Sequence, residues 1–137
     1  MKTLLTLILT LLAAGTLFAA QASFEYLTAK SDGKSITVEW RTDAETGVAR
    51  FVIERTADGN TYTPVSTIEA RGANSTYRYS DEDALMKGGN DLANRKYTYR
   101  IKIIGADNSV AYSNPINVTH SISGIRRTWG MIKEMFR

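Results

Sequence analysis

The sequence predicts an all-β domain, a sandwich of seven strands in two sheets, followed by a short C-terminal amphipathic helix. Apolar and polar residues alternate along several stretches, most clearly in Ser35–Thr42, where Ile36, Val38 and Trp40 share one face. Turn residues separate these stretches at intervals of about 8–15 residues, which is typical of sandwiches. The apolar residues near the C-terminus instead recur at helical spacing.

Residues 1–22 have the pattern of a secretory signal peptide that is cleaved after Ala22. Lys2 gives a positive start, Leu4 to Phe18 is mostly apolar, and Ala20-Gln-Ala22 is a small-residue cleavage motif. The apolar run is shorter than the roughly 20 residues of a membrane-spanning helix, which disfavours an uncleaved anchor. We therefore expect a secreted, periplasmic or cell-envelope protein. It has no cysteine, so its core alone must stabilise it.

The domain occupies residues 23–119. Strands are expected at 24–30, 35–42, 50–56, 62–68, 76–80, 95–104 and 110–118, the last broken at Asn114-Pro115. Asp32-Gly33 and Asp58-Gly59 provide turns, because glycine tolerates a positive φ. Pro64 places its strand at a sheet edge, since proline cannot donate to the ladder. Residues 43–47 are expected to form a loop, and the acidic residues 81–83 to begin a short helical turn.

Several of these stretches carry a shared pattern. It comprises Ile36-x-Val-x-Trp40, Phe51-x-Ile53, Tyr97-x-Tyr-x-Ile-x-Ile103 and Ser113-Asn-Pro115. In this pattern the chain resembles a fibronectin type III domain. Residues 39–62 resemble more closely the W-T-x-x-E…F-x-I-E-R-S-x-D-G-x-x-F pattern of fibronectin-like modules in exported Bacteroidetes proteins. The matching positions are Trp40, Thr42, Glu45, Phe51, Ile53, Glu54, Arg55, Asp58 and Gly59.

The resemblance covers about 24–119 and implies an immunoglobulin-like sandwich with a binding or spacer role. It implies that Trp40 lies on the second strand and that Tyr97 or Tyr99 forms the tyrosine corner of the sixth. From strand alternation we expect Glu54 and Arg55 to point to opposite faces. Either could then meet Glu39 or Arg41 across a sheet.

The segment 120–137 predicts a basic amphipathic helix. Its apolar residues form one stripe at spacings of three and four, and its basic residues fall on the opposite arc. Such a helix is too short to cross a bilayer and is marginal alone in water, so it needs a surface. The alternatives are its own sandwich, a partner protein or second copy, and an anionic membrane. The expected contact residues are Arg126, Arg127, Trp129, Ile132, Lys133 and Phe136.

Charge and composition argue against a nucleic-acid partner and against an enzyme. The domain carries 12 basic and 13 acidic residues, so the positive charge is confined to the tail. His120 is the only histidine, and the sequence has no nucleophile-elbow pattern. We expect no catalytic residue, cofactor or metal. A calcium site at Asp81, Glu82, Asp83 and Asp91 is the weaker interpretation of that acidic cluster, which we expect to cap a helix.

The sequence therefore favours an exported, non-enzymatic module that mediates protein contacts, with the C-terminal helix as docking element. One alternative is a peripheral envelope protein whose helix lies in the lipid interface. Another is a small carbohydrate-binding domain with an aromatic platform formed by Tyr62, Tyr77, Tyr79 and Tyr112.

Overall fold

A computed structural model describes residues 19–86 and 95–120 of the chain. The described part is all-β apart from one helical turn, and its strands pair in antiparallel fashion. The elements are β1 (Gln21–Ser31), β2 (Ile36–Thr46), β3 (Val48–Thr56), β4 (Thr63–Glu69), β5 (Thr76–Asp81), α2 (Asp83–Met86), β6 (Arg95–Gly105), β7 (Val110–Tyr112) and β8 (Ile116–His120). The predicted C-terminal helix lies outside the described residues.

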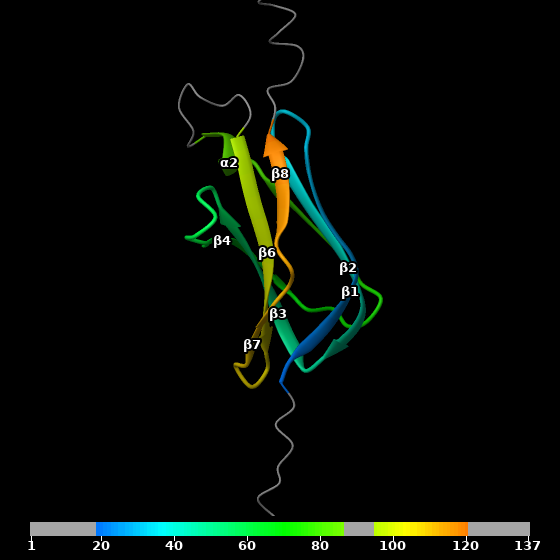
Figure 1. Cartoon of the computed structure of the whole chain (residues 1–137). Helices are drawn as coiled ribbons and strands as arrows, with labels where there is room; N and C mark the ends of the chain where they lie inside the picture. The colour runs from blue at the N-terminus through cyan, green and yellow to red at the C-terminus, as the bar shows by residue number, and fades with distance from the viewer. Residues whose placement is uncertain (1–18, 87–94, 121–137) are drawn as a thin grey trace, which may run out of the picture.

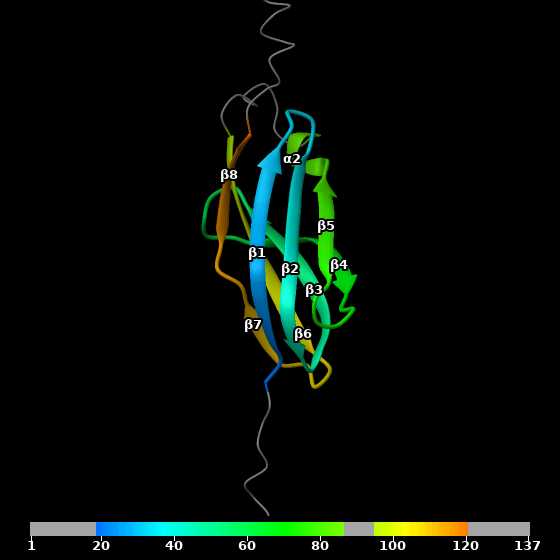
Figure 2. The same ribbon diagram turned by 90° about the vertical axis from the view of Figure 1, so that its right-hand side faces the viewer.

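The strands form two sheets in a sandwich-like arrangement. The three-stranded sheet has the order β1-β2-β5, and the five-stranded sheet the order β4-β3-β6-β7, with β8 also paired to β6. Figure 2 shows the three-stranded sheet in front of the other. The end of β8 and α2 lie at one end of the molecule, and the start of β1 and β7 lie at the other (Figure 1).

The core between the sheets is centred on Trp40, as the alternation of β2 predicts. Trp40 is completely buried. Its ring stacks on that of Tyr77 from β5 at 5.2 Å and meets the edge of Phe51 from β3, in the other sheet, at 5.9 Å. The inward residues of β6 complete the core, namely Tyr97, Tyr99, Ile101 and Ile103. The alternating pattern is therefore confirmed on β2 and β6.

The tight turns follow the predicted chemistry. Asp58 accepts hydrogen bonds from the amides of Asn60 and Thr61 at 2.8 and 2.9 Å, and from the hydroxyl of Thr56 at 2.8 Å. These bonds, the Thr61 amide first, lower the pKa of the Asp58 carboxyl to about 2. Gly59 has a φ of 81°, the left-handed conformation that glycine adopts without strain. Pro64 lies on β4 at the edge of its sheet, as expected.

One boundary differs clearly from the sequence-based expectation. Residues 43–46, expected in a loop, continue β2, because Gln21, Ala22 and Ser23 pair with Thr46, Glu45 and Ala44. Local composition could not indicate this pairing. The expected break at Asn114-Pro115 is confirmed, since it divides the last strand into β7 and β8, both paired to β6. Cleavage after Ala22 stays a prediction. The part of the chain that the structure describes has no helix with the length and hydropathy of a membrane span.

Replacing Trp40 tests the packing of the two sheets. We expect Trp40→Ala to lower the free energy of unfolding by about 3–5 kcal/mol, because it removes contacts to both sheets and leaves a cavity. Denaturant unfolding followed by circular dichroism measures the change. Val110→Ala, at a half-exposed position, is the control and should change stability much less. Equal effects of both substitutions would contradict the central role of Trp40.

The lowered pKa of Asp58 predicts a loss of stability in acid. A carboxyl whose pKa is about 2 in the folded state and about 3.9 in the unfolded state stabilises the fold above pH ~4. That contribution is lost as the pH falls through about 2. Unfolding measured from pH 5 to pH 2 should show a steeper decline for the natural chain than for Asp58→Asn. The same pH dependence of unfolding in the natural chain and in Asp58→Asn would contradict the stabilising role of the Asp58 carboxylate.

Candidate functional site

The predicted contact residues of the tail lie outside the part of the chain that the structure describes. These residues are Arg126, Arg127, Trp129, Ile132, Lys133 and Phe136, and their role stays a prediction. Asp91 also lies outside it. His120 is the last residue of β8, and its backbone pairs with Arg95 of β6.

The motif residues Thr42 and Glu45 form a network at the end of β2. The carboxylate of Glu45 accepts hydrogen bonds from the hydroxyls of Tyr77 and Thr42 at 2.6 and 2.7 Å. Its other oxygen accepts the amide of Gly72 at 2.9 Å. Burial, and then the bond to Glu45, raise the pKa of the Tyr77 phenol. The network holds the connection between β4 and β5 against β2, so its role is structural.

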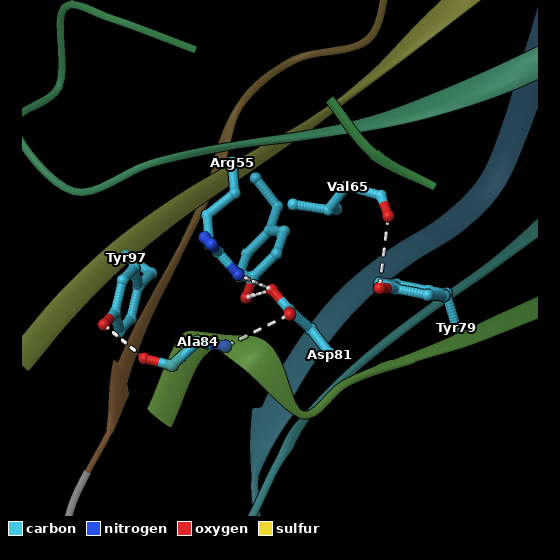
Figure 3. Close-up of polar contacts among 7 residues, drawn as sticks. Arg55, Val65, Tyr79, Asp81, Ala84 and Tyr97 are labelled. Carbon is cyan, nitrogen blue, oxygen red and sulfur yellow. Dashed lines mark hydrogen bonds and ion pairs between the residues drawn. The ribbon is translucent and has the colours of Figure 1, made fainter. Parts of the chain in front are cut away.

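Arg55, Asp81 and Tyr99 form a second network, which we call the inter-sheet cluster. Asp81 on β5 is fully buried and forms an ion pair with Arg55 of β3, in the opposite sheet. The phenol of Tyr99 from β6 donates to the same carboxylate oxygen at 2.7 Å. The Ala84 amide of α2 donates to the other oxygen at 3.2 Å. Figure 3 shows the Asp81 carboxylate between Arg55 and Ala84.

Neighbouring tyrosines extend these contacts. The hydroxyl of Tyr97 donates to the carbonyl of Ala84 at 2.6 Å, and that of Tyr79 donates to the carbonyl of Val65 on β4 at 3.3 Å (Figure 3). Tyr97 therefore bonds to backbone upstream of β6, whereas Tyr99 binds a carboxylate.

The inter-sheet cluster offers no accessible group for catalysis. Burial, and then the bond and charge of Asp81, raise the pKa of Tyr99, so the phenol stays neutral at physiological pH. Burial alone would lower the pKa of Arg55, but the hydrogen bond and charge of Asp81 outweigh it and raise that pKa. Arg55 and Asp81 thus form an ion pair that joins the two sheets.

The calcium interpretation is not supported at Asp81. Both carboxylate oxygens of that residue already have protein partners, and its side chain has no exposed surface. Among residues 19–86 and 95–120, no three or more histidine or acidic side chains gather as metal ligands do. The Ala84 bond instead agrees with the expected capping role.

The predicted tyrosine platform is divided by the fold. Tyr77 is buried in the core, and Tyr79 is half-buried against β4. Tyr62 and Tyr112, however, come together around Arg100 of β6. The guanidinium carbon of Arg100 lies 3.8 Å from the Tyr62 ring centroid and 4.2 Å from that of Tyr112. The arginine therefore separates two tyrosines that lie 50 residues apart in the chain.

Arg100 and its neighbours form a partly exposed feature that we call the tyrosine–arginine surface. It consists of Tyr62, Arg100, Lys102, Val110 and Tyr112. Glu54, the partner of Arg100 in the register, accepts a hydrogen bond from its Nε at 2.8 Å and holds it in place. The expected partners Glu39 and Arg41 contact Tyr26 and Glu25 of β1 instead, because β2 and β3 belong to different sheets.

The residues of the tyrosine–arginine surface share the outer face of the five-stranded sheet. Lys102 pairs with Tyr112 and Ile104 with Val110, while the intervening residues of β6 point into the core. Tyr112 and Val110 are each 50% exposed and are the large apolar residues most open to solvent among the described ones. Arg100 and Lys102 were not among the site residues predicted from the sequence. The alternation of 95–104, which indicated the core face, would also have shown that they face outward.

A groove of about 420 Å³ lies beside this surface, between the start of β1 and β7. Ala22, Phe24, Ile103 and Tyr112 are among its lining residues. Tyr112 therefore borders both the groove and the outer face of the sheet.

No protein-family model and no curated protein matches the chain. Among solved structures it is similar to the pectate lyase PelI from Erwinia chrysanthemi in complex with tetragalacturonic acid. That match has a TM-score of 0.52 and 20% identity, and it covers 72% of this chain and 28% of the enzyme. The β-1,2-glucanase from Parabacteroides distasonis matches with a TM-score of 0.47 and 16% identity, over 77% of this chain and 14% of the other.

The pectate lyase Pel3 from Pectobacterium carotovorum gives a TM-score of 0.47 and 16% identity, over 74% of this chain and 27% of the other. The chain therefore spans less than a third of each of these proteins. At such identities the PelI match supports the fold alone. By name the three are enzymes that act on polysaccharides, rather than fibronectin type III proteins.

The inter-sheet cluster predicts a large effect of removing Asp81. We expect Asp81→Ala to lower the free energy of unfolding by about 3–5 kcal/mol, because Arg55 then keeps a buried charge without its partner. Arg41→Ala is the matched control. It removes the exposed ion pair with Glu25 and should cost less than about 1 kcal/mol. A small effect at Asp81 would contradict the role of the cluster in joining the sheets.

Proposed function

We propose that this chain is an exported, non-enzymatic interaction module of the fibronectin type III kind. The observation that carries the proposal is the internal use of the motif residues. Thr42, Glu45, Glu54, Arg55 and Asp58 all form contacts within the domain. The motif therefore specifies a scaffold, and recognition is left to residues outside it.

The arrangement of strands supports the family part of the proposal. Trp40 lies on the second strand, between a three-stranded and a five-stranded sheet, and Tyr97 at the start of β6 donates to the upstream carbonyl of Ala84. Both features agree with what the sequence resemblance implies. A scaffold of this kind hosts many functions, so the function has to be assigned from its surface.

We further propose that the segment 120–137 forms the docking helix for a protein partner. Trp129, Ile132 and Phe136 would supply the apolar contacts, and Arg126, Arg127 and Lys133 would steer the helix toward an acidic surface. The support is the apolar stripe in the sequence, which a helix of this length must cover to be stable in water.

Truncation after His120 tests the docking proposal. Partners captured from the producing cell's envelope by the mature protein should be lost on truncation and with the triple variant Trp129→Ala, Ile132→Ala, Phe136→Ala, while the melting temperature stays within a few degrees. Lys30→Gln, at an exposed site on β1, is the control and should keep the partners. Retention of every partner by the truncated protein would refute the proposal.

The same variants separate the membrane alternative. Helicity and a blue shift of Trp129 fluorescence induced by anionic vesicles alone would assign the helix to a lipid surface. Loss of stability on truncation would assign it to the domain's own core. Either result would replace the partner-docking proposal.

A further inference from the structure

We propose that the tyrosine–arginine surface is a binding site for acidic oligosaccharides, of the class that carries uronic acid carboxylates. The surface lies on the outer face of the five-stranded sheet, with Tyr62, Arg100 and Tyr112 as its centre. This inference deepens the proposed function, because it names a ligand class for the module. It rests on the proposal that the module binds without catalysing a reaction.

The two tyrosine rings are held in place before any ligand arrives. Arg100 occupies one face of each ring, at 3.8 and 4.2 Å from the centroids, and Glu54 fixes the arginine from below. Half of the surface of Tyr112 is open to solvent and is available to a ligand. A fixed aromatic ring can stack on the C–H face of a sugar with little loss of conformational entropy.

Charge selects an acidic sugar over a neutral one. Lys102 lies directly opposite Tyr112 on the same face and forms no ion pair with the residues that the structure describes. Lys96 lies on the same face of β6, so the cations extend about 20 Å along the strand at ~3.4 Å per residue. Glu54 is already neutralised by Arg100. A ligand carboxylate would therefore meet the Lys102 ammonium group beside the Tyr112 ring.

The geometry favours a sugar over an acidic peptide. Peptides that bind sheets pair their backbone with an open edge, but the residues here lie on a sheet face, where the backbone groups are already paired within the sheet. The neighbouring edge strand, β7, has three residues. What the face presents is aromatic rings and cations, which match the flat rings and carboxylates of a polyuronate.

Binding of defined oligomers to the mature protein tests the proposal. The probes are hexameric galacturonate and alginate fragments, with cellohexaose as the neutral and decaglutamate as the peptide comparison, measured by calorimetry. We expect the uronate oligomers to bind best. Tyr112→Ala should weaken them at least about tenfold and Lys102→Gln about two- to fivefold, with a weaker dependence on salt. Tyr112→Phe keeps the ring and should retain affinity.

Tyr26→Ala and Lys30→Gln on the other sheet are matched controls and should change nothing. No uronate binding at millimolar protein, equal loss in these controls, or equal affinity for decaglutamate would overturn the proposal. A melting temperature for each variant separates lost binding from lost folding. Release of shortened uronate products would instead refute the non-enzymatic function, whether or not the site binds, so the two failures are distinguishable.

Discussion

The alternation of β6 is the constraint on which both the core and the surface depend. Because successive side chains leave a strand on opposite sides, one run of residues supplies Tyr97, Tyr99 and Ile101 to the interior and Arg100 and Lys102 to the exterior. The strand pairs with β3, β7 and β8, so it also fixes the register of its sheet. A shift of one residue would bury the cations and expose the tyrosines.

Two polar networks lie at opposite ends of β2. Asp81 joins the sheets near α2, and Glu45 secures the connection between β4 and β5 at the far end of β2. Between them the core is apolar around Trp40, whose Nε1 has no hydrogen-bond partner among the described residues. The ion pair of Asp81 and Arg55 thus joins the sheets at one end, while burial of aromatic surface supplies the cohesion.

Much of the fold could be predicted from the sequence, since the strands around Trp40, Phe51 and Tyr99 follow a period of two and the turns at Asp32 and Asp58 carry their own signals. The partners across the sheets could not. Arg55 meets Asp81, and Arg100 meets Tyr62 and Tyr112, only because of the order of strands in each sheet. That order depends on long-range packing, which local patterns do not encode. The aromatic surface was therefore divided wrongly, with Tyr77 assigned to it and Arg100 overlooked.

If the chain is exported and cleaved after Ala22, as the sequence predicts, the pairing of Ala22 and Ser23 with the end of β2 bears on the order of these events. A peptidase that cuts between these residues needs them extended and free, whereas the folded strand engages both in a ladder. Closure of β1 at this site would therefore have to follow cleavage. Cleavage would have to occur while the chain is still emerging from the membrane, and a chain that folded first would shield its own leader from removal.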